Sequence, residues 1–322
     1  MKILANDGIA TQGLEILTEN GFEVINEHIP QEELADFLNE NNIDAILVRS
    51  ATEVRQELIE MVPSLKLIGR AGVGMDNIDV DYAREMGLHV INTATASSKS
   101  VAELVFAHMF TMARFLHDSN RNMPLEGDLN FVALKKSYQN AIELNGKTLG
   151  IIGLGRVGKE VAKIGLALGM RVIGADSSDT DGIRTLDFKF PNGQDFKYKI
   201  EVKKIEEILK VSDFVSLHLP AQHQYIISRE QLDMMKDGAF LINTSRGGIV
   251  DEVALIEALE TGKLSAAALD VFENEPTPEI QILMHPKISL TPHIGGSTLE
   301  AQERIGTELA QQIIGLLNED LY

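Results

Sequence analysis

The sequence predicts an α/β protein with two domains, each built around a mainly parallel sheet. Its 322 residues exceed what a single hydrophobic core usually supports. In the first hundred residues, short apolar runs alternate with helix-like stretches, and the same alternation starts again at residue 148. Because such alternation is typical of β-α-β units, we expect each block to form its own sheet.

In the first block, two expected strands end in arginines. Strands are expected at KILAN (2–6), FEVI (22–25), DAILVRS (44–50), LKLIGR (65–70) and HVINT (89–93). Ligands of open α/β sheets bind at the carboxyl ends of strands, and arginine is suited to phosphate and carboxylate. The sequence therefore predicts an anion-binding group here, although a plain turn and a surface arginine remain the alternative. The residues concerned are Arg49, Ser50, Arg70, Gly72, Val73 and Gly74.

A long apolar segment with helical spacing, SVAELVFAHMFTMARFL (100–116), joins the two blocks. Its composition predicts a helix that is packed on both sides or lies at a subunit interface. We expect its His108 to be a core or interface residue.

The second block repeats the strand pattern. Strands are expected at TLGIIG (148–153), RVIGAD (171–176), DFVSLHL (213–219), AFLINTS (239–245) and SAAALDVF (265–272). The segment FKFPNGQDFKYKI (188–200) alternates around Pro-Asn-Gly, which predicts a β-hairpin at the surface.

The segment from 149 to 176 contains a glycine pattern typical of dinucleotide binding. Gly153, Gly155 and Gly158 follow an apolar strand, open a helix that should end near Gly169, and precede a strand that ends in Asp176. These glycines suit a tight turn, approach to a pyrophosphate and close packing of helix on strand. Arg156 and Val157 complete the cofactor-binding turn. A turn without a nucleotide is the alternative.

Asp176 predicts which dinucleotide is preferred. Its carboxylate suits both ribose hydroxyls and would repel a 2′-phosphate. Ser177 and Ser178, which follow it, supply no arginine. NAD is therefore expected rather than NADP.

Composition excludes several other classes of protein. The formal charge of −19 disfavours a nucleic-acid surface. No apolar run is long enough to span a bilayer, and the first residues do not resemble a signal peptide, so we expect a cytoplasmic protein. The chain has no cysteine and its eight histidines are scattered, so we expect no metal site.

Three later segments carry candidate catalytic residues. Arg246 follows an apolar strand, Glu275 precedes a proline, and His293 lies in LTPHIGGSTLE (290–300). Hydride transfer at a carbinol carbon needs a group that exchanges the hydroxyl proton, commonly histidine, and a cation for the acid group. Taken singly, Glu275 is expected to be solvated and His293 structural. Ser297 and Glu300 form a capping-box pattern for the next helix.

Taken together, the order and spacing of these segments resemble the D-isomer-specific 2-hydroxyacid dehydrogenases over nearly the whole chain. The resemblance implies that His293 is the general acid/base and that Arg246 binds the substrate carboxylate. It also implies that Glu275, as a buried carboxylate, hydrogen-bonds to His293 and raises the pKa of its imidazole. Asp270 should lie near the nicotinamide. The other implied cofactor contacts are Val73, Thr244, Ser245, Arg246, His293, Gly295 and Gly296.

The family also implies two Rossmann-like domains. A discontinuous, flavodoxin-like substrate domain would comprise 1–97 and 291–322, and an inserted NAD-binding domain would comprise 98–290. The partner would be a small anionic 2-hydroxy or 2-keto acid, with no nucleic acid and no membrane, and the protein would be a homodimer or higher homo-oligomer.

Four segments resemble the family members that interconvert 3-phospho-D-glycerate and 3-phosphohydroxypyruvate, the first step of the phosphorylated serine pathway. They are LVRSATEV (47–54), GRAGVGMDNIDV (69–80), ELNGKTLGIIGLGRVG (143–158) and RGGIVDE (246–252). The hairpin, residues 118–140 and Leu219 depart from the family. Since no regulatory module follows Tyr322, we expect no serine feedback. A glyoxylate or hydroxypyruvate reductase, and less so an NAD-sensing corepressor, remain alternatives.

Overall fold

The computed structural model describes residues 1–176, 182–189 and 193–319. The chain forms two compact units, which are described separately. Unit 1 comprises Met1–Ser100 and Gly296–Tyr322, and unit 2 comprises Val101–Gly295. These divisions fall a few residues after the boundaries expected at 97 and 290.

Unit 1 contains a five-stranded parallel sheet in the order β2-β1-β3-β4-β5. This is the flavodoxin-like order, in which the strand order reverses between the first and third strands. The sheet confirms the predicted α/β fold class for this unit. Its strands are β1 (Lys2–Ala5), β2 (Glu23–Ile25), β3 (Ala45–Val48), β4 (Leu67–Arg70) and β5 (His89–Asn92).

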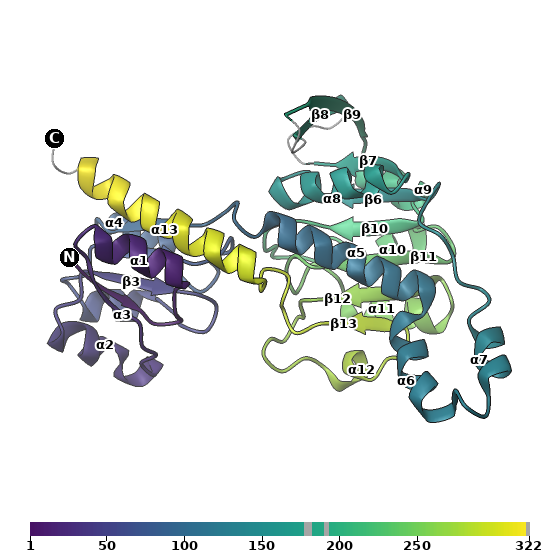
Figure 1. Ribbon diagram of the computed structural model, residues 1–322, viewed down its shortest axis with the longest axis horizontal. Helices are drawn as coiled ribbons and strands as arrows, with labels where there is room; N and C mark the ends of the chain where they lie inside the picture. The colour runs from purple at the N-terminus through teal and green to yellow at the C-terminus, as the bar shows by residue number, and fades with distance from the viewer. Residues whose placement is uncertain (177–181, 190–192, 320–322) are drawn as a thin grey trace. The chain divides into compact units, whose positions relative to one another are not determined.

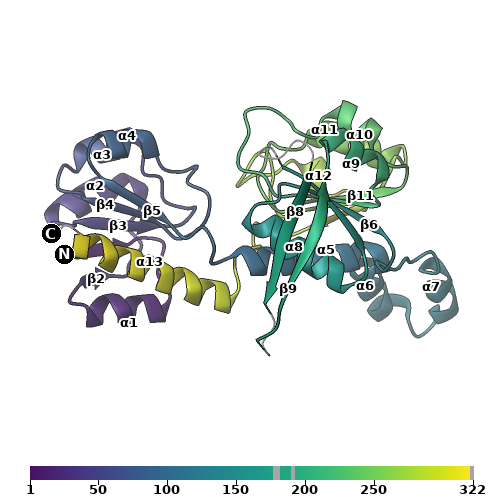
Figure 2. The ribbon, with the colours of Figure 1, turned by 90° about the horizontal axis from the view of Figure 1, so that it is seen from above.

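Alternating side chains of this sheet belong to two different cores. Ile3 and Ala5 pack in the same core as α1 (Thr11–Glu19) and α13 (Leu299–Glu319), whereas Leu4 packs on the opposite face. That face is covered by α2 (Gln31–Glu40), α3 (Gln56–Met61) and α4 (Val80–Glu85), as Figure 2 shows. The C-terminal helix α13 therefore completes the core that begins at the N-terminus.

Helices α1 and α13 approach closely because glycines meet at their crossing. A Cβ at Gly13 would lie 2.6 Å from the Gly306 carbonyl oxygen. A larger residue at this point would force the helices apart.

Unit 2 contains an eight-stranded sheet in the order β13-β12-β11-β10-β6-β7-β9-β8. All its pairs are parallel except β8 with β9. The order reverses between β6 and β10, as in a Rossmann fold. The strands are β6 (Thr148–Ile152), β7 (Arg171–Ala175), β8 (Gly182–Lys189), β9 (Asp195–Val202), β10 (Phe214–Leu217), β11 (Ala239–Asn243), β12 (Leu264–Leu269) and β13 (Ile288–Leu290).

Helices cover both faces of this sheet. Helices α5 (Ser98–Arg114) and α8 (Arg156–Ala167) share one core. The opposite core includes α9 (Ile205–Val211), α10 (Arg229–Met234) and α11 (Glu252–Glu260) (Figure 1). Three further helices are α6 (Leu116–Glu126), α7 (Phe131–Ser137) and α12 (Ile280–Leu283).

The predicted hairpin is confirmed, and it is also part of the main sheet. Strands β8 and β9 form a long antiparallel pair in which Phe188 lies opposite Phe196 (Figure 2). Strand β9 also pairs in parallel with β7, so the hairpin extends the main sheet. The Pro191 and Asn192 of the predicted turn lie outside the described residues.

Helix α5 differs from the prediction. It ends at Arg114, and Phe115 has a left-handed φ of 53° before α6 begins. Within this chain the helix is packed on one side only, because Glu103, Ala107 and Phe110 are exposed. The prediction of packing on both sides is therefore wrong for a single chain.

The start of α13 also differs by one residue. The Thr298 hydroxyl, rather than that of Ser297, accepts a hydrogen bond from the Ala301 N–H at 3.2 Å. The capping box predicted from Ser297 and Glu300 is therefore wrong, and Thr298 caps the helix.

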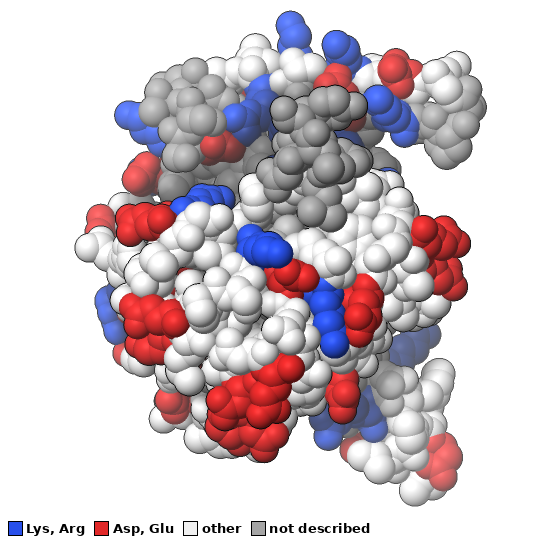
Figure 3. All heavy atoms as spheres, turned by 90° about the vertical axis from the view of Figure 1, so that its left-hand side faces the viewer, with Lys and Arg blue, Asp and Glu red and all other residues white. Residues whose placement is uncertain are grey.

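Acidic residues outnumber basic ones in the chain, with 48 Asp and Glu against 29 Lys and Arg. On the face shown in Figure 3, acidic side chains spread widely, whereas basic side chains are scattered among them. This distribution matches the formal charge of −19. None of the described helices combines the length and apolar character needed to cross a bilayer.

Candidate active site

The three predicted catalytic residues lie in unit 2, beyond the carboxyl ends of three neighbouring strands. Arg246 follows β11, Glu275 lies in the segment after β12, and His293 follows β13. These strands are adjacent in the sheet and parallel. The fold thus delivers all three residues to one edge of unit 2, where α/β sheets bind ligands.

His293 and Glu275 form a direct pair. The His293 Nδ1 lies 2.8 Å from Glu275 Oε2, and Glu275 Oε1 accepts the Phe272 N–H at 3.0 Å. Because an ionised carboxylate only accepts, Nδ1 carries the proton in this contact and Nε2 is directed elsewhere. The side chains are 47% and 36% exposed. The expectation of a buried carboxylate is therefore wrong, whereas the expected hydrogen bond is present.

Asp270 organises the loop that carries His293. Its buried carboxylate accepts the N–H groups of Ile294 and Gly295, both at 2.8 Å, and the Thr291 hydroxyl at 2.6 Å. His293 itself adopts a left-handed φ of 53°. Such a conformation is uncommon for a residue with a side chain, so the Asp270 contacts stabilise an otherwise unfavourable turn.

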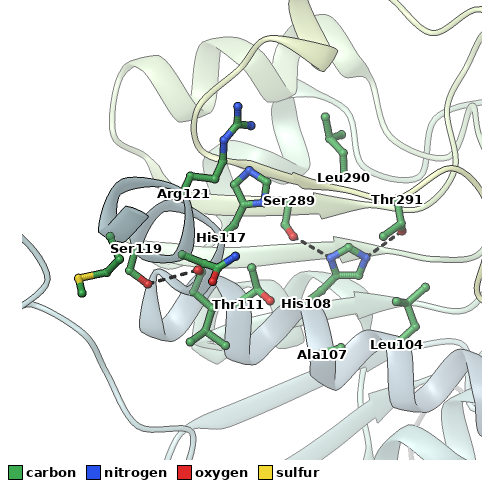
Figure 4. A pocket seen from close by; sticks show the side chains of 13 residues that line it. Leu104, Ala107, His108, Thr111, His117, Ser119, Arg121, Ser289, Leu290 and Thr291 are labelled. Atoms are coloured by element: carbon green, nitrogen blue, oxygen red, sulfur yellow. Dashed lines mark hydrogen bonds between the residues drawn. The ribbon is translucent and has the colours of Figure 1, made fainter. Parts of the chain in front are cut away.

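His108 supports the same loop from α5. It is buried, its Nδ1 lies 2.8 Å from Ser289 Oγ, and its Nε2 lies 3.1 Å from Thr291 Oγ1. Burial lowers the pKa of His108. Figure 4 shows these contacts at the wall of a cavity of about 740 Å³, which α6 also lines. The predicted core role of His108 is confirmed.

The loop of Arg246 is held by a residue that the sequence did not single out. The buried Asn243 donates to the Arg246 carbonyl at 2.9 Å, and its Oδ1 accepts the N–H and the hydroxyl of Ser245. Gly247 packs against the Phe272 carbonyl, where a Cβ would collide. This close approach joins the Arg246 loop to the segment that carries Glu275. The Thr244 hydroxyl is buried without a hydrogen-bond partner in the described structure.

The glycine pattern has the geometry of a dinucleotide-binding turn. Gly153 has a φ of 98°, and a Cβ there would collide with the His218 carbonyl. Gly158 packs on the Gly153 carbonyl in the same way, which brings α8 close to β6. At Gly155 a Cβ would meet nothing within 4 Å. The open side at the N-terminus of α8 therefore fits a pyrophosphate, and Arg156 and Val157 begin that helix.

Asp176 follows β7, as predicted, but it has an unexpected neighbour. Arg184 of β8 forms an ion pair with it, with Nη1 2.6 Å from Asp176 Oδ2. The prediction considered only Ser177 and Ser178, which lie outside the described residues. The hairpin's register, which brings Arg184 to this place, could not be read from the residues next to Asp176.

The remaining predicted residues lie in unit 1. Arg49 and Ser50 follow β3 and line a cavity of about 460 Å³. Asp7, which the sequence reasoning missed, accepts the Arg49 N–H at 2.6 Å and the Thr52 hydroxyl at 2.6 Å. The Arg49 Nε is buried without a partner in the described structure.

Arg70 lies at the end of β4 in the same unit. Its Nε donates to Asn77 Oδ1 at 3.2 Å, and Asn77 in turn donates to the Arg49 carbonyl at 2.8 Å. A Cβ at Gly72 would lie 2.6 Å from Arg70 Nη1, so glycine leaves room for the folded-back guanidinium. Asn77 therefore links the two predicted arginine segments. Val73 and Gly74 follow in the same loop, and Gly296 lies after the return of the chain to unit 1.

The site geometry agrees with the result of comparison with known families. The model for the D-isomer specific 2-hydroxyacid dehydrogenase NAD binding domain matches residues 106–295. The chain belongs to this family. Residues 106–295 are its NAD-binding domain, and NAD is the cofactor.

Individual members of the family are similar over almost the whole chain. A hydroxypyruvate reductase of Thermotoga maritima is 41% identical over 318 residues, which are 97% of each chain. A D-3-phosphoglycerate dehydrogenase of Methanocaldococcus jannaschii is 40% identical over 329 residues, covering 100% of this chain. The match covers only 58% of that relative's length.

A solved member shows the same fold. The structure of D-lactate dehydrogenase from Aquifex aeolicus, complexed with NAD and lactic acid, has a TM-score of 0.74 and 29% identity. The superposition covers 100% of this chain and 96% of the D-lactate dehydrogenase chain.

Proposed function

We propose that this protein is an NAD-dependent dehydrogenase that interconverts 3-phospho-D-glycerate and 3-phosphohydroxypyruvate. The observation that carries the proposal is the His293–Glu275 pair, at 2.8 Å, beyond the ends of β13 and β12, with Arg246 beyond the end of the adjacent strand β11. An imidazole oriented by a carboxylate, with a guanidinium near it in the fold, suits proton exchange on a 2-hydroxy or 2-keto acid.

Each residue has a distinct role in this mechanism. NADH, when bound, supplies a hydride to the keto carbon. His293 gives a proton from Nε2 to the keto oxygen, which becomes the hydroxyl, and takes a proton back in the reverse reaction. Glu275 orients the imidazole by accepting from Nδ1. Arg246 binds the carboxylate, and Asp270 holds the His293 loop.

Cofactor contacts are proposed from unit 2 at the glycine turn and the strand ends. The glycine turn binds the pyrophosphate at the N-terminus of α8. Thr244, whose buried hydroxyl has no partner in the described structure, would contact the nicotinamide portion. Ser245, Gly295 and, from unit 1, Val73 and Gly296 complete the proposed set.

The arginines of unit 1 support the proposal that the substrate is phosphorylated. Arg49 has a buried Nε without a partner in the described structure, and it lines a cavity with Ser50. A guanidinium with an unused donor is a favourable place for a phosphate. We assign the phosphate to Arg49 and Arg70, with Ser50 and the Gly72–Gly74 loop beside them.

A hydroxypyruvate reductase is the second candidate. It is favoured by the Thermotoga maritima relative, which is 41% identical and matched over 97% of its length. Hydroxypyruvate carries no phosphate, so the two candidates make different demands on Arg49.

A substrate panel with NADH tests the proposal. We expect kcat/KM for 3-phosphohydroxypyruvate to exceed that for hydroxypyruvate, and R49Q to reduce only the former, by about tenfold or more. Arg55, a half-buried arginine after the same loop that pairs with Glu53 and Asp79, provides the matched control R55Q. A preference for hydroxypyruvate would overturn the phosphate assignment and support the second candidate.

We also propose that the protein is a homodimer. Several large apolar side chains of α6, α7 and their connection are exposed in the single chain. They are Leu116, Met123, Leu125, Leu129, Phe131 and Val132, which we call the apolar arm. Because monomers rarely expose so many apolar residues together, a second copy is the proposed partner of this arm.

A further inference from the structure

An arginine from the β8–β9 hairpin contacts the acid that ends β7. Arg184 Nη1 donates to Asp176 Oδ2 at 2.6 Å and to the Leu154 carbonyl at 2.9 Å. Leu154 lies between Gly153 and Gly155, and its N–H donates to the same Asp176 oxygen at 3.1 Å. The hairpin, the end of β7 and the glycine turn are therefore joined through one ion pair.

The register of the hairpin sets the position of Arg184. On β8, Leu186 is buried and Arg184 is half-buried, whereas Ile183 and Thr185 are exposed. Arg184 thus shares the inward face of the strand with Leu186, which packs in the core of α8. The side chains of Arg184 and Asp176 are only 20% and 16% exposed. This is a fixed internal arrangement, unlike a mobile surface arginine.

The ion pair lies where a Rossmann domain receives the adenosine ribose. An acid at this strand end accepts from the ribose hydroxyls and repels a 2′-phosphate, whereas a nearby arginine accommodates that phosphate. Both kinds of residue are present here. The guanidinium offsets the negative charge of Asp176, and its planar donors match the oxygens of a phosphate.

We propose that this protein accepts NADP(H) as well as NAD(H), and that Arg184 binds the 2′-phosphate. With NAD(H), Asp176 accepts hydrogen bonds from the ribose hydroxyls. With NADP(H), Arg184 exchanges the carboxylate for the phosphate as its acceptor. The proposal rests on the NAD-binding domain and is independent of which hydroxy acid is the substrate.

Binding of two small nucleotides tests the proposal without any turnover. The probes are 5′-AMP and 2′,5′-ADP, which differ only by the 2′-phosphate. Calorimetric titration of the full chain should give wild-type affinities within about threefold of each other. R184Q should weaken 2′,5′-ADP about tenfold or more, since one charged hydrogen bond is lost, and 5′-AMP less than about threefold. In R184Q the affinity for NADPH should fall as much as that for 2′,5′-ADP, and the affinity for NADH as little as that for 5′-AMP.

A matched control and a conservative variant separate binding from folding. Arg171 lies at the opposite end of β7 and pairs with Glu201 at 3.8 Å, so R171Q should leave the affinity ratio of the two nucleotides unchanged. R184K, which keeps the charge but not the planar donors, should give an intermediate ratio. Circular dichroism melting of each variant verifies that it is folded.

The opposite substitution provides a second test. D176S removes the acid and should weaken 5′-AMP and NADH while strengthening 2′,5′-ADP and NADPH. The proposal is overturned if the wild type binds 2′,5′-ADP more than about tenfold more weakly than 5′-AMP. It is equally overturned if folded R184Q keeps the wild-type ratio. Neither result depends on activity with 3-phosphohydroxypyruvate.

Discussion

At the scale of single residues, the chemistry depends on one imidazole and the carboxylate that orients it. The Glu275 carboxylate bonds to His293 Nδ1 and to the Phe272 N–H at once, so its own position is determined. Loss of His293 and loss of the Glu275 charge therefore affect catalysis differently. Without His293 no proton is exchanged, whereas without the charge of Glu275 the ring is still partly oriented.

His293→Gln should reduce kcat by about 10²–10⁴-fold, which is the usual contribution of a general acid/base. E275Q should cause a smaller loss, because an amide oxygen still accepts from Nδ1. Steady-state kinetics measure both effects, and NADH titration should show an unchanged affinity. The exposed His223 supplies the control H223Q. Near wild-type turnover by H293Q would remove His293 from the mechanism.

His218 makes stability depend on pH. It is half-buried, with Nε2 2.8 Å from Ser216 Oγ and with a buried Nδ1 that has no partner in the described structure. Burial lowers the pKa of His218 to about 3. The unfolded chain therefore binds this proton below about pH 6.5 while the folded protein does not, so stability falls as pH decreases through that window.

H218Q should remove this part of the pH dependence. Between pH 7 and pH 4.5 the wild type should lose about 2–3 kcal/mol of unfolding free energy through His218, and the variant should not. Urea denaturation at both pH values measures the difference. Any loss of packing energy in H218Q is the same at both pH values, so it does not affect the difference in unfolding free energy between pH 7 and pH 4.5. If the wild type, H218Q and H223Q lose equal amounts, His218 does not titrate as described.

At the scale of elements, two glycines of the turn between β6 and α8 have different roles. Gly158 has the Gly153 carbonyl against it, whereas Gly155 has open space on its Cβ side. The former therefore serves packing, and the latter serves approach by a ligand.

The pair of variants G158A and G155A tests this division. G158A should reduce the unfolding free energy by about 1–3 kcal/mol, because a methyl group must push α8 from β6. G155A should change stability by less than about 0.5 kcal/mol. It should nevertheless weaken NADH binding about tenfold or more, because the methyl group occupies the pyrophosphate position. Denaturation and NADH titration supply both readings, and equal stability losses would contradict the assignment.

Strand ends could be predicted from sequence more readily than the contacts between loops. Arg246, Asp270 and His293 follow apolar runs, so their delivery to one sheet edge was foreseeable from periodicity and the parallel topology. Asn243 and Asp7 could not be identified, because each acts through backbone groups of loops whose conformations the local sequence leaves open. Arg184 was missed for a related reason: its contact with Asp176 requires the hairpin register, and its sequence neighbours carry no motif.

At the scale of the whole molecule, the apolar arm predicts self-association. Helices α6 and α7 hold each other through Tyr138, which donates to Asp118 at 2.8 Å and accepts from Asn122 at 2.9 Å. Their apolar side chains nevertheless point to solvent in the single chain. Burying them against a second copy would stabilise the assembly by removing apolar area from water.

Light scattering coupled to size exclusion should find a dimer for the wild type and a monomer for L129D or V132D. Val253, which is also exposed but lies on α11, provides the control V253D, which should remain dimeric. A wild-type monomer at micromolar concentration, or dimeric L129D and V132D, would refute the arm as the interface.

The packing of α13 on α1 determines when each unit can complete its fold during synthesis. Unit 2 is continuous from Val101 to Gly295, so all its strands are synthesised before α13. Unit 1 begins the chain, yet one face of its sheet is covered only in part, by α1, until Ala310 and Ile313 of α13 reach it. Because domains fold as units, the first part of the protein to be synthesised is the last to mature. During that interval the partly covered apolar face of unit 1 is a surface that a chaperone can bind.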